Sequence, residues 1–397
     1  MDELNKQSNV FDYLIWRGDL SFKESKINEI DIVVLTQISI LDLKGIVPSI
    51  DEDQSISIYD AYEAFHKDER DKKKIGLIIP STIIRAFNKL HKLHRFKHIE
   101  AMHYLEDISL EDEMQISATT FKISDDEYLI CFSGTDDTII GWKENFNMMY
   151  KFPVPAQVCA CDYVNKVASK HPNAKFYIAG HSKGGNMALY STYTCELDVF
   201  KRIVSTFNYD GPGLSTKDES FFDESRTKKI LTIVPQSSVV GVLFDHKEKI
   251  VYIRSIQDGA YQHDVFSWLV KGTDFVYEKD LTREGRAIRD KTKEVMSEMS
   301  ELEKEKFANN LYLLFSAGNA YNLLDANEKK KYFWDAYFKM PKEERKYVIN
   351  PLRKLLKDRD IQKTVFNTFR GMINDNKNTK KIEKEEKDKA KNLKTKS

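Results

Sequence analysis

A serine flanked by glycines is the strongest chemical signal in this sequence. Gly180-His181-Ser182-Lys183-Gly184 fits the G-x-S-x-G pattern of a nucleophile elbow, in which a strand turns sharply into a helix around a reactive serine. Glycine is needed two residues before and after the serine, because a larger side chain would collide with the turn. An apolar run precedes the motif and a helical pattern follows it. Ser182 is therefore predicted to be a nucleophile.

A nucleophilic serine requires hydrogen-bond donors for the oxyanion that forms during its attack. The backbone N–H of Lys183, at the start of the predicted helix, is one expected donor. The second donor should come from a loop that follows another buried strand. Thr135 lies in such a loop, after an apolar run that ends at Phe132. The oxyanion hole is therefore predicted to consist of the N–H groups of Lys183 and Thr135.

A serine hydroxyl is inert at neutral pH without a general base, and a histidine is expected to supply one. Of the nine histidines, His246 and His263 follow the motif. His263 lies in a loop after a predicted strand, at the edge where a parallel sheet delivers such a residue, so it is the predicted base. His246 lies before that strand in a charged turn and is expected at the surface.

The carboxylate that should orient His263 is left open by the sequence. Hydrolases with this motif have the chain order Ser, then Asp or Glu, then His. The natural position lies after the next strand but one, yet residues 235–238 contain no carboxylate. Asp245 is the preferred candidate, and Asp210, at the end of the preceding strand, is the alternative. Ser238 or a backbone carbonyl is a further candidate for holding the histidine.

Strands and helices alternate between residues 59 and 277 in a way that predicts an α/β-hydrolase-like sheet. Several of the strands are apolar enough to be buried on both faces, which favours a mostly parallel sheet flanked by helices. Residues 155–170 are predicted to form a helix that joins the first two strands. The predicted strands are short runs rich in β-branched and aromatic residues, at 127–134, 174–180, 202–211, 228–234 and 249–255.

The C-terminal part of the chain has a different pattern of apolar and charged residues. Residues 281–370 carry apolar side chains at helical spacing, which predicts a helical C-terminal module. Residues 371–397 are rich in lysine and lack aromatic side chains, so a disordered tail is expected. The predicted organisation is a hydrolase-like domain with an N-terminal extension over 1–280, followed by this module and this tail.

The composition excludes several classes of protein. Lys+Arg and Asp+Glu are 62 each, so no bulk positive charge indicates a nucleic-acid partner. Four cysteines cannot build a disulfide framework in 397 residues, and no run reaches the roughly 18 apolar residues that span a membrane. A cytoplasmic protein without a transmembrane segment is expected. The basic stretch 89–98 leaves a peripheral membrane contact open.

Five motifs resemble, in their order, a bacterial family of unknown function whose members look like α/β-hydrolases related to the class 3, fungal-type lipases. The motifs are FSGTDDTIIGWKENF, GHSKGGNMALY, FNYDGPG, VPQSSVVGVLF and QHDVFSW, and the resemblance covers roughly residues 9–272. It implies Ser182 as nucleophile, His263 as base and Thr135 near the oxyanion hole. The chain departs from class 3 lipases at Lys183, where they have leucine, and after Val234-Pro235, where their aspartate is missing.

The function that these residues indicate is a serine hydrolase that acts on carboxylic esters, among them lipid acyl chains, through an acyl-enzyme. Neither a metal nor an organic cofactor is expected, and the substrate is a small-molecule or lipid ester. A hypothesis of another class is a catalytically weakened hydrolase fold that serves as a binding or scaffold protein, with the C-terminal helices as its partner surface. The missing acid favours the second hypothesis, and the intact elbow favours the first. Acyl transfer to an acceptor other than water fits the same residues.

Overall fold

A computed structural model describes residues 7–73, 76–77, 79–366 and 368 of the chain. Within these residues the strands are β1 (Ile56–Ser57), β2 (Glu100–Ser109), β3 (Met114–Lys122), β4 (Glu127–Phe132), β5 (Lys175–His181), β6 (Ile203–Tyr209), β7 (Ile230–Pro235), β8 (Lys249–Ile253), β9 (Val270–Lys271), β10 (Asp274–Phe275) and β11 (Tyr277–Glu278). The α-helices are α1 (Val10–Arg17), α2 (Glu29–Ile38), α3 (Ile58–Lys67), α4 (Thr82–Leu90), α5 (Ile139–Asn147), α6 (Pro155–Lys170), α7 (Lys183–Thr194), α8 (Leu197–Arg202), α9 (Glu224–Thr227), α10 (Arg283–Glu298), α11 (Glu301–Phe315), α12 (Leu323–Glu328), α13 (Lys330–Lys339) and α14 (Lys342–Leu355).

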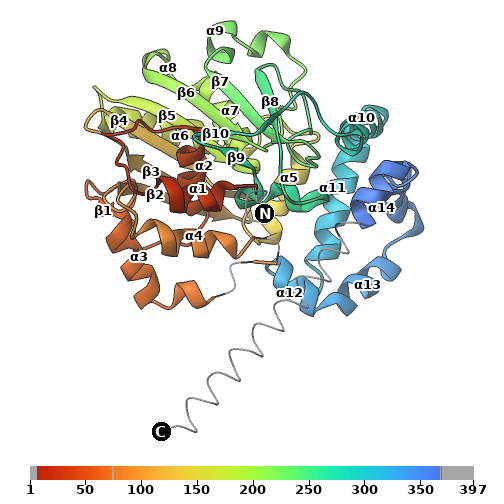
Figure 1. The fold of residues 1–397 in the computed structure, drawn as a ribbon. Coiled ribbons are helices and arrows are strands. Elements are labelled where there is room, and N and C mark those ends of the chain that lie inside the picture. The colour runs from red at the N-terminus through yellow and green to blue at the C-terminus, as the bar shows by residue number, and fades with distance from the viewer. Residues whose placement is uncertain (1–6, 74–75, 78, 367, 369–397) are drawn as a thin grey trace, which may run out of the picture.

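The centre of the described chain is a nine-stranded sheet with the order β1-β2-β3-β4-β5-β6-β7-β8-β11 (Figure 1). Strands β4 to β8 are mutually parallel, and antiparallel strands extend the sheet at both edges. Each of the five predicted strands is present, and α6 joins β4 to β5 as expected. The predicted α/β-hydrolase-like sheet flanked by helices is therefore confirmed.

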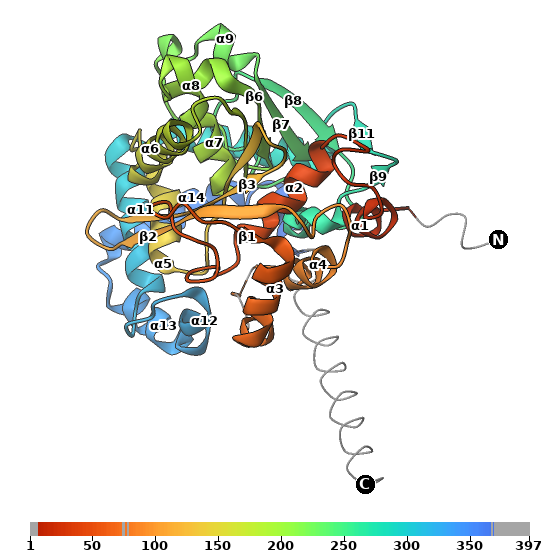
Figure 2. The same ribbon diagram turned by 90° about the vertical axis from the view of Figure 1, so that its left-hand side faces the viewer.

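The two faces of the sheet are covered by different sets of helices, because successive side chains of a strand point to opposite faces. In β4, Leu129 and Cys131 belong to a core with α1 to α4, whereas Ile130 and Phe132 belong to a core with α6 and α7. Figure 2 shows α2 on one side of the sheet and α6 and α7 on the other. Burial on both faces explains why β4, β5 and β7 are almost continuously apolar.

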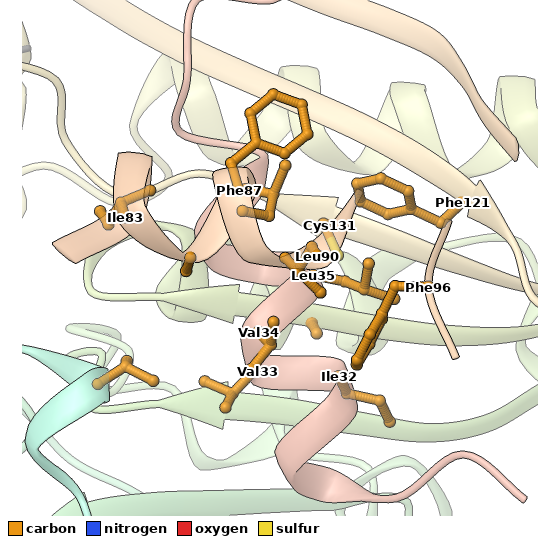
Figure 3. Packing of buried hydrophobic residues seen from close by; sticks show 14 of the residues in the cluster. Ile32, Val33, Val34, Leu35, Ile83, Phe87, Leu90, Phe96, Phe121 and Cys131 are labelled. Carbon is orange, nitrogen blue, oxygen red and sulfur yellow. The ribbon is translucent and has the colours of Figure 1, made fainter. Parts of the chain in front are cut away.

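Helix α2 fills the centre of the first core. It begins at the N-cap Asn28, and all its residues from Ile30 to Ile38 are buried. Its side chains pack against Phe87 of α4 and against Phe121 and Cys131 of the sheet (Figure 3). Because this helix is buried on all its sides, α2 is an internal element of the domain.

The basic stretch 89–98 lies partly inside the protein. The side chains of Arg95 and Asp31 are fully buried and form an ion pair, with the Arg95 Nε at 2.7 Å from Asp31 Oδ1. Phe96 is also buried. Arg95 therefore stabilises the interior and is not available to a membrane surface. None of the described helices combines the length and the apolar character that crossing a bilayer requires.

Helices α10 to α14 form a helical region at one side of the sheet, coloured cyan to blue in Figure 1. Helix α11 packs against α5, α13 and α14, so it connects this region to the sheet domain. The helical C-terminal region predicted from the sequence is confirmed, whereas the exact domain boundary at residue 280 stays a prediction. The Lys-rich segment 371–397, for which disorder is predicted, lies outside the described residues.

Candidate active site

Ser182 occupies a strained turn between β5 and α7. Its backbone has φ +58° and ψ −129°, a conformation that residues other than glycine rarely adopt. A Cβ atom on Gly180 would lie 2.0 Å from the carbonyl of Gly184, and one on Gly184 would lie 2.2 Å from the carbonyl oxygen of Phe132. Both flanking glycines are therefore sterically required, as the motif predicts.

The neighbouring strand brings Asp210 beside this turn. His181 and Tyr209, the last residues of β5 and β6, are register partners, and the Ser182 N–H donates to the Tyr209 carbonyl at 3.0 Å. Asp210 follows Tyr209 directly and has a positive φ of +48°. Ser182 and Asp210 thus leave two adjacent parallel strands at the same edge of the sheet.

Asp210 holds the imidazole of His263. The His263 Nδ1 lies 2.7 Å from Asp210 Oδ2, and the Asp210 carboxylate is almost fully buried. A buried carboxylate accepts hydrogen bonds, so the proton of the neutral ring is on Nδ1 and Nε2 is left as its basic nitrogen. The side chain of His263 is 30% exposed, which leaves it within reach of a substrate.

The second oxygen of the Asp210 carboxylate is also occupied. Ser238 Oγ donates to Asp210 Oδ1 at 2.5 Å, and the Gly241 N–H donates to the same oxygen at 3.1 Å. These bonds fix the orientation of the carboxylate and compensate for its burial. Ser238, a candidate for orienting the histidine directly, contacts the acid instead.

The preference for Asp245 as the acid is wrong. Its carboxylate is half exposed and pairs with Lys293, whose Nζ lies 2.9 Å from Asp245 Oδ1. The alternative residue, Asp210, makes the contact with His263. Asp245 lies in the loop that follows the second strand after Ser182. Asp210, which contacts His263, instead follows β6, the strand adjacent to β5. An aspartate placed directly after that strand, followed by Gly-Pro-Gly, was the available signal.

His246 is also placed differently from the expectation of a surface residue. Its imidazole is buried, and its Nδ1 lies 2.6 Å from Glu248 Oε1. It belongs to a separate histidine–carboxylate pair and makes no hydrogen bond with Asp210. His263 is therefore the histidine that the structure brings to the site.

His181, the residue before Ser182, packs against His263. Its ring centroid lies 4.3 Å from that of His263, and its Nε2 lies 3.0 Å from the His263 carbonyl oxygen. Burial, and then the nearby His263, lower the pKa of His181 well below its usual value. His181 is therefore neutral and donates from Nε2 to this carbonyl. The side chain of His181 thus helps to hold the backbone of His263.

The two predicted oxyanion donors lie on either side of Ser182. The loop after β4 approaches the serine so closely that a Cβ atom on Gly134 would lie 3.3 Å from Ser182 Cβ. Thr135 follows Gly134, and Lys183 is the first residue of α7. Among the described residues, neither Thr135 nor Lys183 donates a hydrogen bond from its backbone N–H. Both donors are thus free to bind a negatively charged oxygen.

The Lys183 side chain explains how lysine replaces the leucine of class 3 lipases at this position. The side chain is buried and its Nζ donates to Glu144 Oε2 at 2.5 Å and to the Gln115 carbonyl at 2.6 Å. Glu144 also accepts from the backbone N–H of Gln115 and of Ala156. The ammonium group is therefore held in a buried polar cluster by Gln115 and Glu144. No group of three His, Cys, Asp or Glu side chains in the described chain is arranged to hold a metal ion.

The sequence profile of the Mbeg1-like family matches residues 90–313, which is more than half of the chain. The chain belongs to the Mbeg1-like family. The relationship predicted from the ordered motifs is thus confirmed. In this Mbeg1-like protein the matched region contains Ser182, Asp210 and His263.

Solved structures similar to this Mbeg1-like protein include the Lip2 lipase of Yarrowia lipolytica, with 12% identity, a TM-score of 0.30, and coverage of 59% of this chain and 88% of that chain. The Rhizomucor miehei lipase propeptide complex has 14% identity, a TM-score of 0.33, and coverage of 57% and 70%. A mutant form of MDLA from Penicillium cyclopium has 10% identity, a TM-score of 0.33, and coverage of 66% and 88%. A search of curated proteins gives no match. At these identities and TM-scores, the function has to be argued from the site.

Proposed function

We propose that this Mbeg1-like protein is a serine hydrolase that cleaves carboxylic esters. One observation carries the proposal: the strained Ser182 lies at the sheet edge beside Asp210, and Asp210 binds the accessible His263 at 2.7 Å. A nucleophile, a base and an acid that come from three separate loops and meet at one edge form the constellation of a catalytic triad.

In the proposed reaction, Ser182 Oγ attacks the carbonyl carbon of the ester and its proton passes to His263 Nε2. Asp210 stabilises the imidazolium, and the N–H groups of Lys183 and Thr135 bind the oxyanion of the tetrahedral intermediate. The C–O bond of the ester then breaks and the leaving alkoxide takes the proton from His263. Water adds to the acyl-enzyme with His263 again as base, which releases the carboxylic acid and regenerates Ser182.

The alternative of a catalytically weakened scaffold loses its main support. That hypothesis depended on the apparent absence of an acid, and Asp210 is a candidate acid with both of its carboxylate oxygens bonded. Free N–H donors on both sides of the serine also favour a working site, because a binding scaffold has no need to keep them unpaired. Ester hydrolysis is therefore the stronger proposal.

The proposal is tested with a fluorophosphonate probe, which reacts only with an activated serine. Wild type is expected to be labelled, and Ser182→Ala is expected to lose the label completely. Ser191→Ala is the matched control, because Ser191 lies on the same helix and its buried Oγ has no hydrogen-bond partner within the described residues. A folded wild type that does not react would contradict the proposal. A panel of p-nitrophenyl esters of rising chain length would then separate short-chain esters from lipid acyl chains.

A further inference from the structure

We infer that Asp137 is a positioning residue through which the C-terminal helices hold the oxyanion loop in its working shape. The oxyanion loop is defined here as residues 133–138, between β4 and α5, and it contains Thr135. The inference rests on the proposed function, because it gives a consequence to the position of the Thr135 N–H. It connects Asp137, which lies within the residues 90–313 matched by the family profile, to a segment that lies beyond them.

The connection between α11 and α12 pairs with the oxyanion loop much as a short strand would. We name residues 321–324 the clamp segment. Thr138 and Asn322 form an antiparallel bridge, and the Ile139 N–H donates to the Tyr321 carbonyl at 3.0 Å. The Leu323 N–H donates to the Asp137 carbonyl at 2.9 Å. The backbone of the loop is therefore tied to the C-terminal region by hydrogen bonds in both directions.

The Asp137 carboxylate adds a second level of attachment. Its Oδ2 accepts from the Leu324 N–H at 3.1 Å, and its Oδ1 accepts from the Leu77 N–H at 2.8 Å. The two donors are separated from Asp137 by 187 and 60 residues of sequence. Asp137 is 7% exposed, so these hydrogen bonds are protected from water. One side chain thus joins the oxyanion loop to an N-terminal and a C-terminal segment.

The position of Asp137 is transmitted to Thr135 over a short and stiff path. Asp136 lies between them and accepts from the Thr138 N–H at 2.9 Å, and Thr138 caps α5 through a bond from the Gly141 N–H. Thr135 Oγ1 accepts from Asn145 Nδ2 of α5 at 2.7 Å. These hydrogen bonds make residues 135–138 a stiff segment. Because the segment is stiff, we expect a displacement of Asp137 to shift the N–H group of Thr135 as well.

The clamp segment is itself anchored by α11, which packs on α5. The rings of Phe146 and Phe307 lie 6.2 Å apart in an edge-to-face arrangement, and Lys143 Nζ donates to Asn309 Oδ1 at 2.7 Å. The oxyanion loop and the clamp segment also share the wall of a cavity of about 340 Å³. The C-terminal helices therefore act on the oxyanion hole as a brace, and we expect its loss to affect the transition state more than the bound substrate.

The first test is Asp137→Ala, with Asp335→Asn on the exposed side of α13 as a control for the loss of a carboxylate. We would measure kcat and KM for a p-nitrophenyl ester, together with the Ki of a trifluoromethyl ketone that binds as a tetrahedral oxyanion. Because removal of one oxyanion donor typically costs about 10²–10³-fold in kcat, misplacement of one is expected to cost about 10–100-fold. The ketone should weaken by a similar factor while KM stays within about threefold.

A second variant distinguishes the loss of the oxyanion-loop contact from a loss of activity caused by unfolding of Asp137→Ala. Leu323→Pro removes a single N–H donor at the first residue of α12, a position that accepts proline, and Asn322 before it is already extended with φ −134° and ψ 174°. Leu323→Ala keeps the donor and is expected to lose much less activity than Leu323→Pro. Thermal unfolding of all variants reports their folded fraction.

The outcomes separate the two proposals. If wild type is not labelled by the fluorophosphonate, the proposed function fails and the inference fails with it. If wild type is active but Asp137→Ala and Leu323→Pro keep its kcat and its affinity for the ketone, only the inference is overturned. An increase in KM at unchanged kcat would also overturn it, because that result indicates a role in substrate binding.

Discussion

Among the histidine–carboxylate pairs of the described residues, the two whose carboxylates are almost fully buried are built alike. His263 Nδ1 lies 2.7 Å from Asp210, and His246 Nδ1 lies 2.6 Å from Glu248. Both carboxylates are almost fully buried. In isolation, either pair has the chemistry of a base oriented by an acid.

The hydroxyl groups behind the two pairs extend the likeness. Ser238 Oγ donates to Asp210 at 2.5 Å, and Thr232 Oγ1 donates to Glu248 at 2.5 Å. In each case a hydroxyl, a carboxylate and an imidazole follow one another in a hydrogen-bonded chain. The difference between the two pairs therefore cannot come from the residue types within them.

The surroundings of the two imidazoles differ. The side chain of His263 is 30% exposed and lies in the loop that packs on His181, the neighbour of Ser182. The side chain of His246 is 5% exposed, and its Nε2 has no partner among the described residues. A histidine–carboxylate pair can serve as a base only where its free nitrogen reaches both a nucleophile and a substrate. Because the Nε2 of His246 is buried, the second pair is a structural one.

Exchange of each histidine for alanine gives the largest expected contrast. His263→Ala should abolish fluorophosphonate labelling and lower ester hydrolysis by about 10³-fold or more, because the serine loses its base. His246→Ala should keep labelling but lower the free energy of unfolding by about 1–3 kcal/mol, because Glu248 is left buried without its partner. Labelling rates and urea unfolding measure the two effects. The assignment of the two pairs would be reversed if His246→Ala abolished labelling and His263→Ala did not.

Neutralisation of each carboxylate tests which acid belongs to the site. Asp210→Asn is expected to lower kcat by about 10²–10⁴-fold, because the amide no longer selects the tautomer with a basic Nε2. Glu248→Gln should leave kcat within a few fold of wild type. Asp245→Asn serves as the control, since its carboxylate pairs with a surface lysine. The kcat of each variant is measured by steady-state kinetics with one p-nitrophenyl ester. A larger loss of kcat in Asp245→Asn than in Asp210→Asn would restore Asp245 as the acid.

The pH dependence of stability is expected to differ between two carboxylates that lie beside these histidines, Glu248 and Asp264, and the effect is smaller than those above. Burial opposes ionisation of Glu248, but the hydrogen bond and the charge of His246 outweigh it and lower the pKa of Glu248. Its stabilising contribution is therefore present above the unfolded-state pKa and is lost as the pH falls through the lowered folded-state pKa. Next to His263, burial raises the pKa of Asp264 from 3.8 to about 6.

The contribution of Asp264 to stability changes with pH in the opposite direction to that of Glu248. The native state binds more protons than the unfolded state between the two pKa values of this carboxyl, so stability falls as the pH rises from 3.8 to about 6. Asp264→Asn removes this loss. Relative to wild type, it is expected to gain on the order of 2–3 kcal/mol between roughly pH 4 and pH 7.5. Urea unfolding across this range measures the gain, and a difference that does not change with pH would contradict the prediction.

The strands that were not predicted from the sequence have a physical explanation. Strand β2 contains a register shift between Met102 and Leu105, which breaks the alternation that marks a strand. In β3 nearly every residue is buried, yet the polar side chains of Ser117, Thr119 and Thr120 interrupt the apolar pattern. Their burial depends on α6 and on the neighbouring strands, which local sequence does not describe.

Local sequence was enough to predict the parallel core of the sheet and the tight turn around Ser182. The glycines around Ser182 are a local requirement of a tight turn, and the apolar runs of β4, β5 and β7 are a local requirement of burial on both faces. Both features can therefore be recognised in the sequence. The sequence named Asp210 only as an alternative acid, and the contacts of Asp210 with His263 and of Asp137 with Leu324 are visible only in the folded protein. Asp210 qualifies because β6 lies beside β5, and Asp137 matters because a segment 187 residues away donates to it. Such contacts depend on strand order and helix packing, which no local pattern of residues encodes.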